Sequence, residues 1–185
     1  QSGLSRPTAH RLLSSLAAQG FVDRDLVSGA WLLGPELYLM GAVAADRYDI
    51  SKLAREHVPA LAEATGESAF LPARRGNETV CLLRQDGSFP IRSFVLYEGK
   101  RFPLGVASAG LVILSFMPSE AVDEYIENNA LEIEHGPQHS ADQLRLRVAE
   151  TRSRGYAVNP GLVVEGSWGM GAAVFDRSGA PAWAL

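Results

Sequence analysis

The sequence predicts an α+β protein built from a partial winged helix-turn-helix, a linker helix and a larger domain in which helices flank an antiparallel sheet. Near the start, apolar residues recur at helical spacing up to a glycine, and two short strand-like segments follow at once. Beyond them, helical segments are mixed with strand-like ones, and no internal repeat is present. We expect the three parts to occupy residues 1–34, 35–48 and 49–185.

The first helix has one apolar and one polar face. Ser5 is a good N-cap because its hydroxyl can accept a hydrogen bond from a free backbone N–H, and Pro7 is tolerated in the first turn. Gly20 is placed to end the helix. The polar face offers hydroxyl and guanidinium groups, which reach phosphates and base edges in DNA-binding helices. With Arg24 of the next segment, the candidate DNA contacts are Ser5, Arg6, Pro7, Thr8, His10 and Arg11.

The segment after Gly20 leaves two interpretations of this helix. Residues 21–24 and 30–33 are strand-like, and Ser28-Gly29 marks a turn between them. A polar-faced helix followed at once by a β-hairpin is typical of a winged helix-turn-helix, in which the hairpin is the wing. The alternative is a surface helix that leads into an ordinary hairpin, because helix faces rich in Ser, Thr and Arg are common.

The composition excludes several classes of protein. A chain of 185 residues, 46% hydrophobic and 21% charged, is ordinary for a globular protein. The net charge of −4 is unlike that of a wholly basic nucleic-acid binder, although residues 1–34 hold three arginines against two aspartates. The single cysteine, Cys81, allows no internal disulfide. Because no apolar run could cross a bilayer and no signal peptide opens the chain, we expect a cytoplasmic protein without membrane contact.

Residues 35–48 are predicted to form a short apolar linker helix, with Pro35 at its first position. Leu37, Leu39, Met40 and Val43 make it too apolar to stand alone in water. A second copy of the chain is the expected partner for this surface. The alternative is a linker that is buried within one chain.

In the larger part we expect a helix that begins at Ser51 and is kinked or broken near Pro59. A hairpin of residues 68–73 and 79–84 follows, and Cys81 lies within it as a buried, inert thiol. Residues 128–139 are expected to be polar and loosely structured. Further strands are predicted at 92–97, 156–158, 170–175 and 182–185, and further helices at 111–116, 119–126 and 141–154.

The segment Val106-Ala107-Ser108-Ala109-Gly110 invites two chemical interpretations. A serine nucleophile on a tight strand-to-helix turn needs glycine two places before the serine, where this chain has Val106. Small residues at the start of a helix instead allow a close approach to backbone N–H groups, which hold carboxylates well. We therefore predict a carboxylate site here and assign no catalytic residue.

Metal and cofactor sites find little support in the sequence. His135 and His139 are four residues apart, but proline and glycine intervene and no cluster of carboxylates or thiols is near. We expect them to be solvated loop histidines. A phosphate-binding loop motif is also absent from the sequence, so we assign neither a metal nor a cofactor.

Several blocks of the chain, in order, resemble the IclR family of bacterial transcriptional regulators. The segment GLSRPTAHRLLSSLAAQGFVDRD with the later GAWLLGPEL is similar to the family's DNA-binding end. LAEATGES, RFPLGVASAG and TRSRGYAVN are similar to parts of its effector domain, and AAVFDRSGAPAWAL to its last strands. Family members continue beyond both ends of this sequence, so we expect a truncated chain.

The resemblance implies a GAF-like effector domain and binding to double-stranded operator DNA. It also implies a homodimer, or a dimer of dimers, and a small organic acid as effector. By position in the family's pattern, the effector-binding residues would be Val106, Ala107, Ser108, Ala109, Gly110, Asn159, Trp168, Gly169 and Met170.

This chain departs from the family pattern at two of those positions. Asn159 and Gly169 stand where polar or acidic side chains are frequent. With Trp168 and Met170 beside them, this change predicts a larger and more apolar ligand, such as an aromatic acid. The alternative is that Trp168 and Met170 simply fill the core.

Two classes of function remain. One is a ligand-responsive transcriptional regulator in which the effector changes the spacing of two DNA-binding domains. The other is a metabolite-binding protein or enzyme of GAF-like fold that has no role on DNA.

Overall fold

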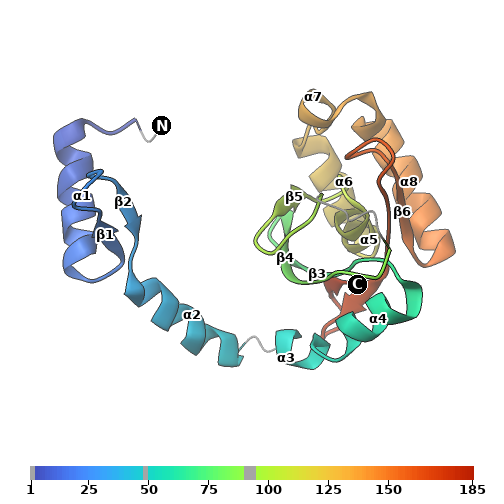
Figure 1. The fold of residues 1–185 in the computed structure, drawn as a ribbon. Helices are drawn as coiled ribbons and strands as arrows, with labels where there is room; N and C mark the ends of the chain where they lie inside the picture. Colours follow the sequence, from blue (N-terminus) through green and yellow to red (C-terminus); the bar gives the residue numbers. More distant parts are fainter. Residues whose placement is uncertain (1–2, 48–49, 90–94) are drawn as a thin grey trace. The chain divides into compact units, whose positions relative to one another are not determined.

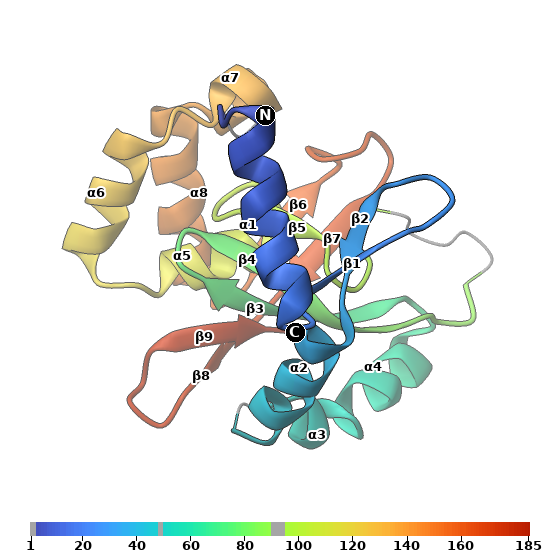
Figure 2. The same ribbon diagram turned by 90° about the vertical axis from the view of Figure 1, so that its left-hand side faces the viewer.

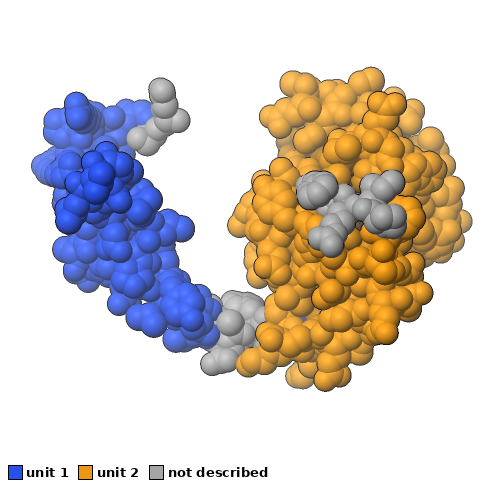
Figure 3. Space-filling model, in the orientation of Figure 1, with its two compact units in different colours: residues 1–50 blue, residues 51–185 orange. Residues whose placement is uncertain are grey.

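The computed structural model describes residues 3–47, 50–89 and 95–185 (Figure 1). The chain folds into two compact units, residues 1–50 and 51–185, which Figure 3 colours separately. Among the described residues, no helix combines the length and the apolar character that crossing a bilayer requires.

The first unit is a helix, a two-stranded hairpin and a second helix. Helix α1 (Arg6–Ala18) starts after Ser5, whose hydroxyl accepts a hydrogen bond from the Thr8 N–H at 3.4 Å. Strands β1 (Val22–Arg24) and β2 (Trp31–Leu33) pair antiparallel, and α2 (Pro35–Arg47) follows. The predicted helix, hairpin and linker helix are therefore confirmed, with Ser5 as the N-cap.

Side chains in the first unit are mostly open to solvent. Gly34 is the one buried residue among those whose burial is described in this unit. Its position is tight, because a Cβ atom there would lie 2.1 Å from the carbonyl oxygen of Gly20. Leu12 and Leu16, on the apolar face of α1, remain 52% and 43% exposed. This unit thus presents apolar surface that its own residues leave uncovered.

The second unit is built on a five-stranded sheet with the order β5-β4-β3-β9-β8, in which all described pairs are antiparallel (Figure 2). A separate hairpin is formed by β6 and β7. The strands are β3 (Ala69–Arg75), β4 (Glu78–Gln85), β5 (Arg101–Pro103), β6 (Ala157–Pro160), β7 (Trp168–Gly171), β8 (Ala173–Phe175) and β9 (Pro181–Ala184). The helices are α3 (Ile50–Ala54), α4 (His57–Thr65), α5 (Ser108–Ser115), α6 (Ser119–Asn128), α7 (Glu132–His135), the 3₁₀ turn η1 (Pro137–His139) and α8 (Ala141–Arg154).

Helix α5 is the centre of this unit. It packs against strands β3, β4, β8 and β9 of the sheet on one side and against α8 on the other, and α8 in turn packs against α6. Every residue from Ala109 to Ser115 is buried. The α+β class and the antiparallel sheet predicted from the sequence are confirmed.

The structure corrects several predicted elements. Of the strand expected at 92–97, residues 92–94 lie outside the described part, and Val95, Leu96 and Tyr97 are not in a strand. The strand that pairs with β4 is instead β5, within a segment that was expected to be a loop. The break expected in the helix from Ser51 is confirmed, but it lies between Ala54 and His57, before Pro59, and the helix already begins at Ile50. The segment expected at 170–175 forms two strands, β7 and β8, separated at Ala172.

The end of α5 is closed by a side chain from α8. Arg152 donates from Nε to the Ser115 carbonyl at 2.5 Å and from Nη2 to the Met117 carbonyl at 3.1 Å. These acceptors lie at the C-terminus of a buried helix, where carbonyl groups lack partners within the helix and a cation is favourable. Arg152 therefore ties α8 to α5 through charge-assisted hydrogen bonds.

We expect Arg152→Met to lower the free energy of unfolding by about 1–2 kcal/mol, because two carbonyl groups lose their charged donor while the aliphatic part of the side chain is largely kept. Urea unfolding followed by circular dichroism measures this change. The matched variant Arg145→Met, on the same helix, loses one exposed ion pair of 3.8 Å with Asp142 and should change stability by less than about 0.5 kcal/mol. Equal losses in the two variants would contradict this role of Arg152.

Candidate functional site

The polar face of α1 is exposed. Arg6, Pro7, His10 and Arg11 are all open to solvent, and Thr8 is partly buried. The Ser5 hydroxyl bonds Thr8 twice, at the backbone N–H and at Oγ1 (2.9 Å). Both hydroxyl groups are thus engaged in starting the helix, whereas the side chains of Arg6 and Arg11 are exposed on its polar face.

Trp31 of β2 joins the hairpin to α1, and sequence reasoning did not identify it. The His10 ring meets the Trp31 ring edge-on with centroids 5.9 Å apart, and the Arg24 guanidinium lies 5.8 Å from the same ring. His10 also lies 3.3 Å from the Ser14 hydroxyl through Nδ1. The structure therefore gathers His10 and Arg24 around Trp31, where their first role is to orient the hairpin.

The turn of this hairpin is held by the side chain of Asp25. Asp25 accepts hydrogen bonds at Oδ1 from the N–H groups of Val27 (3.1 Å) and Ser28 (2.6 Å) and from the Ser28 hydroxyl (2.7 Å). These bonds lower the pKa of Asp25, with the Ser28 N–H as the main cause, so the carboxylate stays ionised. A negative charge at the turn makes the two arginines of α1 the better candidates for contact with phosphate.

In the second unit, the Val106–Gly110 loop leads into the start of α5. Ala107 is the N-cap residue, with extended backbone (φ −96°, ψ 166°), and no side chain caps the helix there. The first helical hydrogen bond of this end is made by the Leu111 N–H to the Ala107 carbonyl at 2.9 Å. The N–H groups of Ser108, Ala109 and Gly110 precede it, and the first N–H groups of a helix have no acceptor within the helix. The predicted helix start at 111 is therefore corrected to Ser108.

Strand β7 runs close to this helix start. The Ser108 hydroxyl donates to the Met170 carbonyl at 3.3 Å, and a Cβ atom on Gly169 would lie 3.1 Å from that hydroxyl oxygen. A Cβ atom on Gly171 would lie 3.4 Å from the Ala109 backbone nitrogen. The two glycines thus allow β7 to approach α5 closely. The space that a side chain at Gly169 would fill is taken by the Ser108 hydroxyl, so the glycine itself adds no volume for a larger ligand.

Trp168 and Met170 lie on the face of β7 that is turned away from α5. Alternate residues of a strand face opposite sides, and Gly169 and Gly171 face α5. Trp168 and Met170 are 72% and 69% exposed. The expectation that they line an apolar pocket together with the Val106–Gly110 loop is not supported, and neither fills the core.

Asn159 and His139 both contact the carbonyl group of Val106. Asn159 lies in β6 rather than in a loop, and its Nδ2 donates to the Val106 oxygen at 2.8 Å. His139 is buried, which corrects the prediction of a solvated histidine. Its Nε2 lies 3.4 Å from the same oxygen, and its Nδ1 lies 2.9 Å from the His135 carbonyl oxygen. Burial, followed by the nearby Arg147 guanidinium, holds the pKa of His139 below its usual value, so the ring is neutral at pH 7.

Other groups of the second unit offer less for chemistry. Burial raises the pKa of the Cys81 thiol to about 11, so it stays protonated and unreactive at neutral pH. In the described part of the chain, His, Cys, Asp and Glu side chains form no group of three or more that could hold a metal ion.

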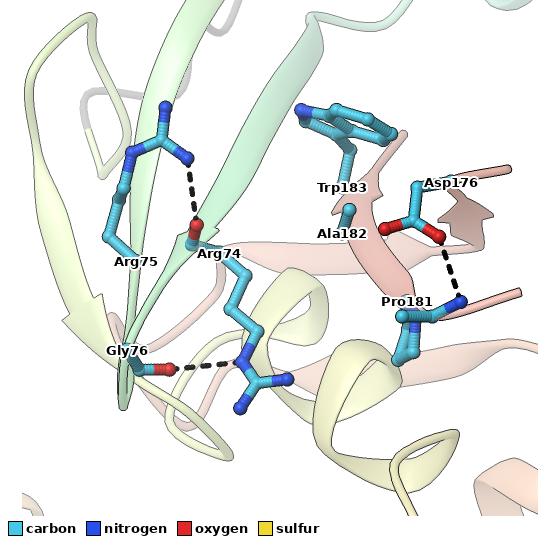
Figure 4. Close-up of a pocket in the computed structure, with 8 residues that line it drawn as sticks. Arg74, Arg75, Gly76, Asp176, Pro181, Ala182 and Trp183 are labelled. Atoms are coloured by element: carbon cyan, nitrogen blue, oxygen red, sulfur yellow. Dashed lines mark hydrogen bonds between the residues drawn. The ribbon is translucent and has the colours of Figure 1, made fainter. Parts of the chain in front are cut away.

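A shallow pocket of about 260 Å³ lies beside the β3–β4 and β8–β9 turns (Figure 4). Its arginines are turned toward their own hairpin, because Arg74 Nε donates to the Gly76 carbonyl and Arg75 Nη1 to the Arg74 carbonyl. Asp176 accepts a hydrogen bond from the Ala180 N–H. Since these groups are engaged by nearby backbone, the start of α5 is the better candidate for a ligand site.

Comparisons with known proteins decide the family. The C-terminal model of bacterial transcriptional regulator IclR matches residues 42–185, and the IclR helix-turn-helix model matches residues 1–26. The chain belongs to the IclR family of bacterial transcriptional regulators. It is 31% identical over 95% of its length to the HTH-type transcriptional regulator KipR of Bacillus subtilis, and the match covers 70% of KipR. The names of such relatives describe transcriptional regulators, which is a non-enzymatic role.

Solved structures support the same conclusion about the fold. The IclR structure from Thermotoga maritima is 26% identical, with a TM-score of 0.72, and the match covers 98% of this chain and 73% of that one. An IclR homologue from Microbacterium hydrocarbonoxydans, solved with 4-hydroxybenzoate, has a TM-score of 0.81 at 20% identity, over 98% of this chain and 75% of that one. At that identity the likeness concerns the fold.

Proposed function

We propose that this IclR-family protein is a ligand-responsive regulator that binds double-stranded operator DNA and responds to a small organic acid. The observation that carries the DNA-binding part is the combination of α1, exposed on its polar face, with a hairpin oriented against it by Trp31. This arrangement is that of a recognition helix followed by a wing. We keep the predicted division into residues 1–34, 35–48 and 49–185 as part of this proposal.

On DNA, α1 would lie in the major groove with Arg6 and Arg11 as its main contacts. Both are exposed cations on the polar face, and guanidinium groups bind guanine edges or phosphates. Ser5, Pro7 and Thr8 would fix the start of the helix near the backbone, while His10 and Arg24 hold the wing. Two copies of the chain would read two half-sites of a pseudo-palindrome.

Helix α2 supplies the proposed contact between copies. Its apolar side chains are exposed within the first unit: Leu37, Tyr38, Leu39, Met40 and Val43. Apolar surface of this kind on a helix favours packing against an identical helix in a dimer. We therefore propose a homodimer, with a dimer of dimers as the larger form, in the cytoplasm where its DNA is found.

The effector would bind at the start of α5. The N–H groups of Ser108, Ala109 and Gly110 carry the partial positive charge of the helix N-terminus, and no side chain caps them. A carboxylate is the chemical group that suits this end. Binding would shift the equilibrium between states that differ in how two DNA-binding units are held.

The DNA-binding proposal predicts the behaviour of two arginine variants. Arg6→Ala and Arg11→Ala should each weaken binding to the DNA upstream of the protein's own gene by about 1–3 kcal/mol, because each removes a guanidinium contact. A gel-shift titration at fixed salt measures the change. Arg177→Ala, an exposed arginine in the turn between β8 and β9, should bind like wild type. Unchanged binding in both α1 variants would rule out α1 as the recognition helix.

The dimer proposal predicts the effect of a charge on α2. Met40→Glu should give monomers in sedimentation velocity and lose cooperative DNA binding, because a carboxylate cannot be buried unpaired in an apolar interface. Met170→Glu is the matched control, since Met40 and Met170 are 55% and 69% exposed, and it should leave the oligomeric state unchanged. A Met40→Glu protein that keeps the wild-type oligomer would show that α2 is not the interface.

The effector proposal predicts that the backbone N–H of Ser108 contributes to binding of the acid. Ser108→Pro removes this N–H. Proline is tolerated here because Ser108 is the first position of α5 and because Ala107 before it is already extended. Ser108→Ala loses the same hydroxyl and keeps the N–H. Calorimetry with 4-hydroxybenzoate should show roughly tenfold weaker binding in Ser108→Pro than in Ser108→Ala, as expected for a lost hydrogen bond to a charged group. Equal affinities in the two variants would place the carboxylate elsewhere.

A further inference from the structure

Three segments of the second unit meet at one oxygen atom, the carbonyl oxygen of Val106. Val106 directly precedes Ala107, the N-cap of α5. Asn159 reaches this oxygen from β6, and His139 reaches it from η1. All three residues are buried, with 1%, 5% and 1% of Val106, Asn159 and His139 exposed. The position of this oxygen therefore affects where the following N–H groups of α5 lie.

Asn159 is well placed to hold that carbonyl group. Its Nδ2 donates to the Val106 oxygen at 2.8 Å, while its Oδ1 accepts from the Leu162 N–H at 2.9 Å. One end of the carboxamide thus fixes the loop before α5, and the other fixes the turn after β6. Because both ends of this buried carboxamide already make hydrogen bonds within the protein, Asn159 would have to break one of them to bind a ligand.

His139 cannot replace this donor while it is neutral. A neutral imidazole has one N–H, yet its two nitrogens face two carbonyl oxygens. The shorter contact, 2.9 Å to His135, is the better place for the proton, since the contact to Val106 is 3.4 Å. The lone pair of Nε2 then faces the Val106 oxygen, which leaves Asn159 as the side chain that donates to it.

We propose that Asn159 is a positioning residue that sets the backbone N–H groups of Ser108, Ala109 and Gly110 by holding the Val106 carbonyl group, and that it is not itself a ligand contact. This inference rests on the proposed effector site at α5. It differs from the sequence-based expectation, in which Asn159 gives a hydrogen bond to the ligand. It also makes His139 a sensitive reporter, because the ring shares the same acceptor.

The test uses Asn159→Asp in the full chain. The aspartate keeps the size of the side chain and the acceptor for Leu162, but as a carboxylate it cannot donate to Val106. Hydrogen exchange at the N–H groups of residues 108–110 should become roughly tenfold faster without any ligand, because the loop before α5 should open more often once the Val106 carbonyl group loses its donor. The matched control is Asn129→Asp, which loses a similar bond of 2.7 Å from Nδ2 to the Tyr125 carbonyl and should leave exchange at 108–110 unchanged.

A second readout separates positioning from general loosening of the fold. The new carboxylate in Asn159→Asp lies beside the oxygen that His139 faces, so the pKa of His139 should rise by about one pH unit or more in an NMR titration. His135 on α7 and Arg147 on α8, the other charged or titratable groups that act on this ring, are unchanged in the variant. No rise in Asn159→Asp, with the new carboxyl group shown to be ionised in the same titration, would overturn the proposed arrangement around Val106.

Binding of 4-hydroxybenzoate distinguishes this inference from the proposed function. Weaker binding together with faster exchange at 108–110 supports positioning, whereas weaker binding with unchanged exchange would make Asn159 a direct contact and overturn the inference. If the wild type binds no acid, the effector proposal fails, while the ligand-free exchange still decides the role of Asn159. If the variant does not fold, hydrogen exchange of the side-chain carboxamide protons in the wild type tests the inference instead. One carboxamide proton of Asn159 should exchange at least about tenfold more slowly than those of the exposed Asn77. Equal rates would overturn the inference.

Discussion

The second unit depends on the burial of one short helix. Helix α5 has eight residues, and its residues from Ala109 to Ser115 have no exposed face, so water cannot satisfy the polar groups at its ends freely. At the C-terminus, Arg152 supplies charged donors to the carbonyl groups of Ser115 and Met117. At the N-terminus no side chain accepts a capping hydrogen bond from the first N–H groups. This asymmetry leaves the start of α5 with free N–H groups, and it is why we place the effector there.

The surroundings of that helix start follow from the same constraint. Strand β7 comes close enough for the Ser108 hydroxyl to reach the Met170 carbonyl, and glycine at 169 and 171 favours this approach, because a Cβ atom at either position would lie only 3.1–3.4 Å from Ser108 or Ala109. On the other side, Asn159 holds the carbonyl group that precedes the helix. The start of α5 is therefore bonded to β7 through Ser108 and to β6 through the carbonyl group of Val106.

The sequence predicted features that depend on local chemistry. The N-cap at Ser5 and the turn at Ser28-Gly29 involve residues only a few positions apart, so their pattern is visible in the chain. Strand β5 was missed because its three residues are defined by pairing with β4, more than twenty positions earlier. The burial of His139 and the bonds of Asn159 to Val106 arise between segments 33 and 53 positions apart, and no local signal reports them. The exposure of Trp168 and Met170 likewise depends on which face of β7 meets α5, and the sequence of the strand does not show this.

The most direct measurement of the central claim is an NMR titration of ¹⁵N-labelled protein with 4-hydroxybenzoate, compared with the uncharged 4-hydroxybenzamide. A carboxylate at the start of α5 predicts that the acid moves the amide signals of Ser108, Ala109 and Gly110 more than any others in the second unit, and that the amide compound does not. Saturable shifts that leave these three signals in place and gather elsewhere, for example around Arg74 and Arg75, would contradict the account.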